Sequence, residues 1–273
     1  MPSQLPVMWP ANLERRFGGL ARLYGAEGAK RIRAAHVVVI GLGGVGSWAA
    51  EALARSGVAG LTLIDLDHIA ESNINRQIHA LDNTLGQAKV EAMRERIAHI
   101  NPECDVRCVE EFVDAGNWPG IAGLELEAGA PVSIIDACDQ VKAKTAIAAW
   151  ALQHNARHKQ NIANFITVGA AGGKRHAHKI EIEDLSLSTH DPLLAQLRYR
   201  LRKEQGASRQ GKMGVSCVFS RESVMRPVSG VGAEGDSRQT DSSLNCHGYG
   251  SVVSVTSTFG ICAAGWLLDK IAS

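Results

Sequence analysis

The four β-branched residues Val37 to Ile40 run directly into the glycine-rich segment Gly41-Leu42-Gly43-Gly44-Val45-Gly46. A continuous apolar run of this kind is typical of a strand buried on both faces. The Ala- and Leu-rich segment 47–55 then predicts a helix, and Leu61 to Ile64 predict a second buried strand that ends at Asp65. A strand, a glycine turn, a helix and a strand in about 30 residues predict a right-handed parallel unit.

The same alternation continues along the chain. Further strands are expected over 104–109, 132–136 and 165–168, and helices over 90–100 and 141–153. After Gly169 the pattern predicts a half-exposed strand over 179–183, a helix that begins at Asp191-Pro192 and a last strand over 215–219. We therefore expect an α/β fold: a doubly wound, Rossmann-like, mostly parallel sheet with helices on both faces, plus antiparallel strands in the C-terminal half.

Composition places the chain among folded soluble proteins, with 45% apolar and 21% charged residues in 273. We expect one domain over residues 14–272, with a flexible N-terminus over 1–13 and a mobile Gly- and Ser-rich loop over 227–250. The N-terminus lacks the pattern of a secretory signal, and the six cysteines form no C-x-x-C pair, so a reduced cytoplasmic protein is predicted.

One segment near the C-terminus requires a membrane test. Residues 242–268 contain no Asp, Glu, Lys or Arg, and 252–268 are largely apolar. Ser, Thr and Gly residues interrupt the segment, which favours a buried helix over a membrane-spanning one. Peripheral association with a membrane through this segment is the weaker alternative.

The glycine turn has the context that phosphate binding requires. Gly41 permits a tight turn, Gly43 lets the backbone approach a phosphate, and Gly46 allows close packing of helix on strand. The helix N-terminus offers unpaired N–H groups to an anion, and Asp65 is placed to hydrogen-bond a ribose hydroxyl. Glycines used only for close packing are the alternative, and the turn does not separate NAD from ATP.

The residues that follow favour ATP. Asp65 and Asp67 lead into a segment with Asn73, Arg76 and Gln77, and Lys89 follows. Arg and Lys can stabilise the negative charge of a triphosphate, whereas a hydride-transferring enzyme has no evident use for such a cluster. Ordinary solvated charges are the alternative interpretation of Arg76 and Lys89.

These motifs, together with the segment 135–139, resemble those of the ubiquitin-activating-like enzymes, which adenylate a carboxylate with ATP and release pyrophosphate. The resemblance implies that ATP is bound through a set of residues along the chain: Arg22, Gly41, Gly43, Gly44, Gly46, Asp65, Asp67, Asn73, Arg76, Gln77 and Lys89. It implies that Arg76, Lys89 and Asp139 are catalytic, that Asp139 holds Mg²⁺, and that a homodimer lends Arg22 to the partner's site.

Segments 16–25, 75–81, 100–104, 169–173, 211–220 and 256–260 narrow the resemblance to the bacterial tRNA threonylcarbamoyladenosine dehydratases. This branch implies a tRNA substrate that carries threonylcarbamoyladenosine beside the anticodon, and it leaves open a sulfur-transfer protein as a partner. The alternative branch activates the C-terminus of a small sulfur-carrier protein, and the lack of zinc-binding cysteine pairs disfavours it. Residues 175–178 and 227–250 depart from the pattern.

A basic segment is the candidate tRNA footprint. The segment 198–212 contains six basic residues and one acidic residue, Glu204, so its net charge is +5 in a chain of net charge +1. The basic residues are Arg198, Arg200, Arg202, Lys203, Arg209 and Lys212. A solvated helix face is the alternative.

Cys217 or Cys246 could act as a covalent relay, although a lone cysteine is more often a small buried hydrophobe. The histidines at 176, 178 and 190 are too loosely arranged to assign a metal.

Overall fold

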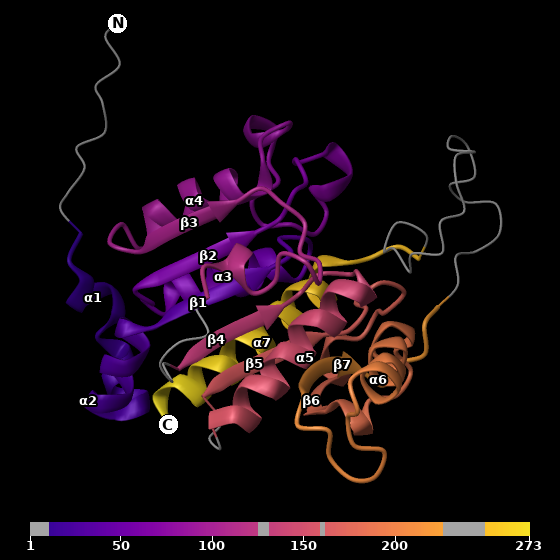
Figure 1. Cartoon of the computed structure of the whole chain (residues 1–273). Helices are drawn as coiled ribbons and strands as arrows, with labels where there is room; N and C mark the ends of the chain where they lie inside the picture. The colour runs from indigo at the N-terminus through magenta and orange to yellow at the C-terminus, as the bar shows by residue number, and fades with distance from the viewer. Residues whose placement is uncertain (1–10, 125–130, 159–161, 226–248) are drawn as a thin grey trace, which may run out of the picture.

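The computed structural model describes residues 11–124, 131–158, 162–225 and 249–273. Within these ranges the chain forms a seven-stranded sheet (Figure 1). The strands are β1 His36–Ile40, β2 Gly60–Ile64, β3 Asp105–Val109, β4 Val132–Asp136, β5 Ala163–Val168, β6 Ile180–Asp184 and β7 Ser216–Ser220. Every strand that the sequence predicts is present, with boundaries that differ by two residues or fewer.

The strand order is β3-β2-β1-β4-β5-β7-β6. All neighbouring strands are parallel except β6 and β7, which are antiparallel. The chain leaves the centre of the sheet from β1 toward β3 and then returns to β4 on the other side of β1. Such a reversal opens a crevice at the carboxyl ends of the two central strands. The predicted doubly wound class, with its antiparallel addition, is confirmed.

The helices are α1 Leu13–Phe17, α2 Gly19–Ala34, α3 Gly46–Arg55, α4 Lys89–Ile100, α5 Val141–His158, α6 Pro192–Glu204 and α7 Val253–Ala272. Short 3-10 turns are η1 Glu71–Asn73, η2 Asp82–Thr84, η3 Gly120–Ala122, η4 Ala177–Lys179 and η5 Leu185–Leu187. Figure 1 shows α5 on one face of the sheet and α7 on the other. The predicted one-domain organisation over 14–272 stays a prediction.

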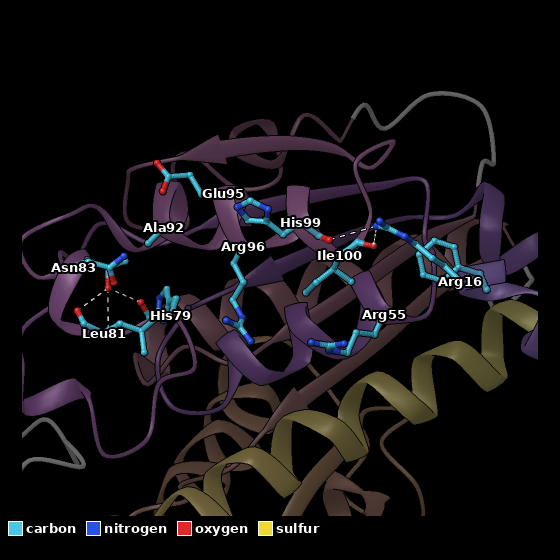
Figure 2. A pocket seen from close by; sticks show the side chains of 12 residues that line it. Arg16, Arg55, His79, Leu81, Asn83, Ala92, Glu95, Arg96, His99 and Ile100 are labelled. Carbon is cyan, nitrogen blue, oxygen red and sulfur yellow. Dashed lines mark hydrogen bonds between the residues drawn. The ribbon is translucent and has the colours of Figure 1, made fainter. Parts of the chain in front are cut away.

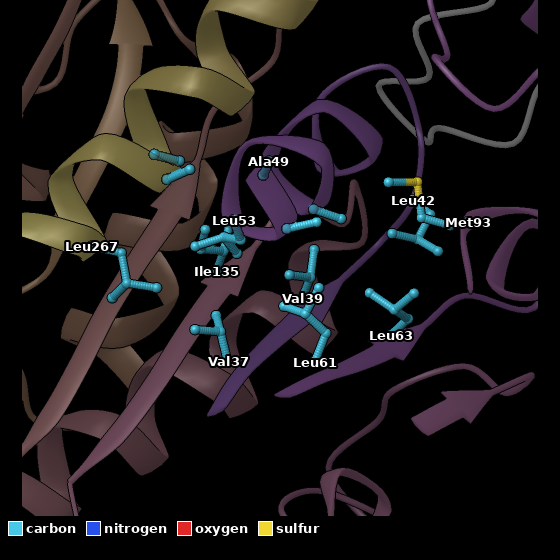
Figure 3. Close-up of a cluster of buried hydrophobic side chains, with 14 of the residues drawn as sticks. Val37, Val39, Leu42, Ala49, Leu53, Leu61, Leu63, Met93, Ile135 and Leu267 are labelled. Atoms are coloured by element: carbon cyan, nitrogen blue, oxygen red, sulfur yellow. The ribbon is translucent and has the colours of Figure 1, made fainter. Parts of the chain in front are cut away.

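Alternate residues of β1 divide the core between the two faces. Val37 and Val39 belong to a buried cluster with Leu53 of α3 and Leu267 of α7 (Figure 3). Val38 and Ile40 belong to a second cluster, which contains Ile147 of α5 and Leu197 of α6. Because successive side chains of a strand point to opposite faces, a strand that is apolar at every position must be covered on both sides. The uninterrupted apolar run of β1 therefore specifies the three-layer arrangement.

The uncharged C-terminal segment forms the buried helix α7. Val255, Phe259, Ala263 and Leu267 recur on its buried face, and the helix packs against α2, α3 and β5. Gly260 permits the close approach to α3, because a Cβ there would lie 2.2 Å from the Val45 carbonyl oxygen. Across the described residues, no helix combines the length and the hydropathy that a bilayer crossing requires.

The helix α6 begins as the sequence predicts. The Asp191 carboxylate accepts the Leu194 N–H at 3.0 Å, and Leu193, Leu197 and Leu201 are buried. The second Asp191 oxygen accepts the Ala170 N–H at 2.9 Å, which ties the end of β5 to the start of α6.

Two predicted flexible segments fall largely outside the described residues. In the predicted N-terminal segment 1–13, Asn12 caps α1 by accepting the Arg15 N–H at 2.9 Å, and residues 1–10 are not described. Of the predicted mobile loop 227–250, only residues 249 and 250 are described.

Candidate nucleotide-binding site

A cavity opens at the carboxyl ends of β1, β2, β4 and β5, where the strand order reverses. Among the residues that line it are nine that the sequence predicts as site residues: Gly41, Gly43, Gly44, Asp65, Asp67, Arg76, Gln77, Lys89 and Asp139. Its apolar wall includes Ile40, Ile64 and Leu66. The cavity thus combines an apolar surface with a polar, partly cationic edge, which suits a nucleotide.

The glycines of the turn have different structural roles. Gly41 has φ +84°, and a Cβ there would lie 2.8 Å from the Cys138 amide nitrogen. A Cβ on Gly46 would lie 1.7 Å from the Gly41 carbonyl oxygen, so Gly46 is buried in the contact of helix with strand rather than in the cavity. No atom of the described residues lies within 4 Å of a Cβ built on Gly43, which leaves its backbone open to the cavity.

Asp65 organises the turn from the end of β2. Its carboxylate accepts the Leu42 N–H at 2.5 Å and the Asp67 N–H at 2.9 Å. Burial raises the pKa of Asp65, and Lys89, whose Nζ lies 3.8 Å from Asp65 Oδ1, opposes that shift. The ammonium of Lys89 also donates to Asp67 Oδ2 at 2.6 Å. A buried cation is therefore held at the edge of the cavity by two carboxylates.

Arg76 and Gln77 reach the cavity from the segment that follows η1. Arg76 Nη1 donates to the Ser72 carbonyl at 2.6 Å and to Asn75 Oδ1 at 3.0 Å, and the stem of Arg76 packs beside Gly44. Trp48 of α3 donates its indole N–H to the Arg76 carbonyl at 2.9 Å, which fixes the backbone at this position. The Gln77 side-chain oxygen is buried and has no hydrogen-bond partner within the described part of the chain, which leaves it available to a bound molecule.

Asp139 is exposed at the rim, in the turn between β4 and α5. Within the described ranges, no group of three or more His, Cys, Asp or Glu side chains is arranged to hold a metal ion. Mg²⁺ is commonly held by one or two carboxylates together with substrate phosphates. One carboxylate at the rim of a cavity lined by a glycine turn, Arg76 and Lys89 fits that arrangement.

Three predicted residues do not line the cavity. Gly46 serves helix packing, as described above. Asn73 is buried, and its side-chain oxygen accepts the Ala70 N–H at 3.2 Å, so that it shapes the turn before Arg76. Arg22 is exposed on α2.

Several lining residues have no counterpart in the sequence prediction. Glu111, Phe112 and Val113 follow β3, Gly169 to Ala171 follow β5, Leu193 begins α6 and Thr256 belongs to α7. Their common property is position: each group follows a strand or begins a helix at the same edge of the sheet. That rule was the available sequence indication for residues 111–113. Residues 169–171 and Thr256 lie in segments that carry the family resemblance, but the resemblance assigned them no role in the site.

A buried ionic network beneath the cavity was also missed. Lys144 of α5 and Asp136 of β4 are both fully buried, with Nζ and Oδ2 3.1 Å apart. Thr167 Oγ1 donates to the same carboxylate oxygen at 2.7 Å, and the Cys138 N–H donates to Asp136 Oδ1 at 3.2 Å. The network thereby fixes the turn that carries Asp139.

The basic segment separates into groups with different surroundings. Arg198 is turned inward, because its Nη1 donates to the Leu185 and Ser188 carbonyls at 3.1 and 2.8 Å. Arg200 pairs with Glu204 at 3.1 Å, and Arg202 donates to the Ser208 carbonyl at 3.2 Å. Lys203, Arg209 and Lys212 are exposed.

The two cysteines considered as relays lie in different situations. Cys217 is fully buried in β7, and burial raises the pKa of its thiol. A buried, protonated thiol is a poor nucleophile, so its environment is that of a small hydrophobe. Cys246 lies outside the described residues.

Comparison with known proteins gives a family match over most of the chain. The ThiF family model matches residues 17–271. The tRNA threonylcarbamoyladenosine dehydratase of Haemophilus influenzae is 41% identical over 263 residues, which cover 95% of this chain and 94% of that protein. The crystal structure of the E. coli tRNA N6-threonylcarbamoyladenosine dehydratase, TcdA, in complex with ATP matches with a TM-score of 0.79 and 39% identity, over 97% of both chains.

The adenylyltransferase branch matches over a much smaller part. Molybdopterin-synthase adenylyltransferase of Salmonella typhimurium is 41% identical over 95 residues, only 35% of this chain. The long matches therefore decide the assignment: the chain belongs to the ThiF family and, within it, to the tRNA threonylcarbamoyladenosine dehydratases.

Proposed function

We propose that this protein is an ATP-dependent tRNA threonylcarbamoyladenosine dehydratase. The observation that carries the proposal is the cavity at the strand reversal, where an open glycine backbone meets Arg76, Lys89 and the unpartnered oxygen of Gln77. The ATP complex of the E. coli relative, which aligns over 97% of this chain, supports ATP as the nucleotide.

The chemistry proceeds in two steps. The threonyl carboxylate of the modified adenosine attacks the α-phosphorus of ATP, and pyrophosphate leaves. The neighbouring carbamoyl group then attacks the activated carbonyl, so that a five-membered ring closes and AMP leaves. The modified base loses one water in total, and ATP becomes AMP and pyrophosphate. Because the second step is intramolecular, proximity supplies much of its rate and no enzyme nucleophile is required.

The cavity residues have distinct tasks in this scheme. The backbone of Gly43 and Gly44 receives the phosphates, and Asp65 and Asp67 face the ribose side. Arg76 and Lys89 stabilise the charge that develops as pyrophosphate leaves, because cationic donors held in place lower the energy of such a transition state. Asp139 would hold Mg²⁺, which when bound would neutralise phosphate charge.

A homodimer completes the proposal. Arg22 is exposed on α2 and does not line the cavity of its own chain, which agrees with its acting in a partner's site. We place the enzyme in the cytoplasm, where its tRNA substrate is found. A sulfur-transfer protein as a further partner stays a prediction of the family resemblance.

One experiment tests the function directly. Purified protein is incubated with ATP, Mg²⁺ and tRNA that carries threonylcarbamoyladenosine, and the tRNA is digested to nucleosides for mass spectrometry. The expected product is a nucleoside lighter by two hydrogens and one oxygen, formed with equimolar AMP. Exchange of pyrophosphate into ATP that requires a sulfur-carrier protein and ignores tRNA would instead establish the adenylyltransferase alternative.

A further inference from the structure

A second cavity, of about 640 Å³, lies on another part of the surface (Figure 2). It is bounded by α4, by α3, by the segment 79–84 and by Arg16 and Phe17 of α1. None of its lining residues lines the nucleotide cavity. Nothing in the proposed reaction uses it.

Three guanidinium groups give this cavity a surplus of positive charge. Arg96 donates through Nε and Nη2 to Glu51, at 2.7 and 3.1 Å, and Arg55 donates through Nε to the same carboxylate at 2.7 Å. Arg16 Nη1 donates to the Ile100 carbonyl at the end of α4 at 2.7 Å. A guanidinium carries five N–H donors, so each of the three retains donors that these contacts do not use.

The acidic residues nearby leave part of that charge uncompensated. Glu51 serves Arg55 and Arg96 together, although it carries a single negative charge. Glu95 lies at the rim and accepts from Gln87 at 2.9 Å. Three arginines therefore face two carboxylates, and exposed His99 adds a further polar group.

His79 supplies a second, independent indication of a ligand. Its side chain is 2% exposed and lines the cavity, yet neither ring nitrogen has a hydrogen-bond partner among the residues that the structure describes. A buried polar group left without a partner is unfavourable, so it favours a ligand that supplies one. Burial, with Lys89 and Arg96 close by, lowers the pKa of His79 to about 4, so the ring is neutral at pH 7 and offers one N–H. Figure 2 shows the guanidinium groups of Arg96 and Arg55 between His79 and Arg16.

We propose that this cavity binds a phosphate group, with Arg55 and Arg96 as the cationic donors and His79 as a neutral donor at the buried end. Arginine suits this ligand because its planar fork can donate two parallel hydrogen bonds to phosphate oxygens. The phosphate is either a free anion or a phosphodiester of the tRNA backbone. The second source rests on the proposed function, and the first does not.

The first arm of the test uses inorganic phosphate, with ATP at saturation so that the nucleotide cavity is filled. Phosphate affinity is measured by calorimetry on wild type, on Arg55→Gln and on Arg94→Gln. Arg94 is the matched control, because it lies on α4, pairs with Glu91 and does not line the cavity. If the phosphate is a free anion, Arg55→Gln weakens binding at least tenfold and Arg94→Gln does not. Phosphate also shifts the ¹⁵N resonances of the His79 ring.

The second arm measures tRNA affinity for the same three proteins at fixed salt. If the ligand is a backbone phosphodiester, inorganic phosphate has little effect and Arg55→Gln alone weakens tRNA binding several-fold. The proposal is overturned if Arg55→Gln and Arg94→Gln behave alike in both arms, or if phosphate binds without disturbing His79. The dehydratase assay is separate: a wild-type protein that forms no cyclised nucleoside refutes the proposed function and leaves the phosphate titration interpretable.

Discussion

At the scale of single residues, replacement of Arg76 should slow the chemical step without preventing folding. It is held by Ser72 and Asn75, and it lines the nucleotide cavity. Loss of one donor that stabilises developing charge costs about 2.7–4 kcal/mol in the transition state, roughly 10²–10³-fold in rate. We expect Arg76→Ala to lower pyrophosphate exchange into ATP by that factor in the presence of modified tRNA. Near-normal exchange, with Arg94→Ala as the control, would contradict the assignment.

His79 should make the stability of the protein depend on pH. Its pKa falls from 6.5 to about 4 on folding, mainly through burial, with Lys89 and Arg96 contributing. Between these values the unfolded chain binds a proton that the folded chain does not. The stabilisation is therefore complete above pH 6.5, is lost as pH falls toward 4, and amounts to about 3 kcal/mol.

The measurement is the free energy of unfolding by urea at several pH values from 7 to 4. We expect the decline to be shallower in His79→Gln, whose side chain does not titrate. The His99→Gln variant is the control, because His99 is exposed at the same cavity and its replacement should leave the wild-type slope. Parallel curves for wild type and His79→Gln would show that the His79 pKa is not lowered.

At the scale of elements, two glycines of one turn have different roles, so we expect replacement of one to lower stability and replacement of the other to weaken ATP binding. A methyl on Gly46 would collide with the Gly41 carbonyl, and overpacking of this kind costs about 1–3 kcal/mol or more. We expect Gly46→Ala to lower the free energy of unfolding by at least that much. The methyl of Gly43→Ala meets no atom of the described residues, so this variant should keep the wild-type stability but bind ATP about tenfold more weakly, which corresponds to 1.4 kcal/mol. Equal effects of the two variants on both quantities would contradict this division.

Lys144 of α5 and Asp136 of β4 form a fully buried ion pair. Removal of one partner leaves the other charge buried and unpaired, which lowers the free energy of unfolding by about 3–5 kcal/mol. We expect Lys144→Met to reduce stability by that amount, and we expect Asp136→Asn added to it to restore part of the loss. Arg221→Met is the matched control, because Arg221 and Glu181 form an exposed pair at 2.8 Å worth less than about 1 kcal/mol.

The elements themselves followed from the sequence, because apolar periodicity and cap residues act locally. The pattern of Leu193, Leu197 and Leu201 and the Asp191 cap both predicted α6. The helices α1 and α2 were not predicted, since this segment contains four glycines and Gly25 interrupts α2 with φ +72°. Order within the sheet depends on crossovers between distant strands, which local periodicity does not encode.

The site was predictable where its residues are close together in the chain. The glycine turn and the segment 65–89 supplied the polar edge of the cavity. Phe112, Leu193 and Thr256 were missed, because only tertiary packing brings them to that edge. The sequence also did not predict the direction of side chains. Arg198, for example, donates to two backbone carbonyls of its own chain instead of facing outward.

At the scale of the whole molecule, the charge distribution predicts how tRNA binding depends on salt. The net charge is only +1, yet Lys203, Arg209 and Lys212 are exposed in one segment. If about three basic groups contact phosphates, the logarithm of affinity should fall with the logarithm of salt concentration with a slope of about −2 to −3. Lys203→Ala and Lys212→Ala should each reduce the slope by about 1, measured by filter binding. The exposed Lys30 on α2 is the control position, and a slope near zero in wild type would exclude this surface.

The position of α7 has a consequence for biosynthesis. This helix is the last element of the described chain, yet it packs against α2 and α3, and its Thr256 lines a cavity whose glycine turn is made more than 200 residues earlier. During synthesis, the glycine turn, Arg76 and Lys89 are therefore made before α7, which packs behind the turn. Contacts between residues so distant in sequence form slowly. We therefore expect a translation product interrupted before Val253 to bind ATP more weakly than a chain that includes α7.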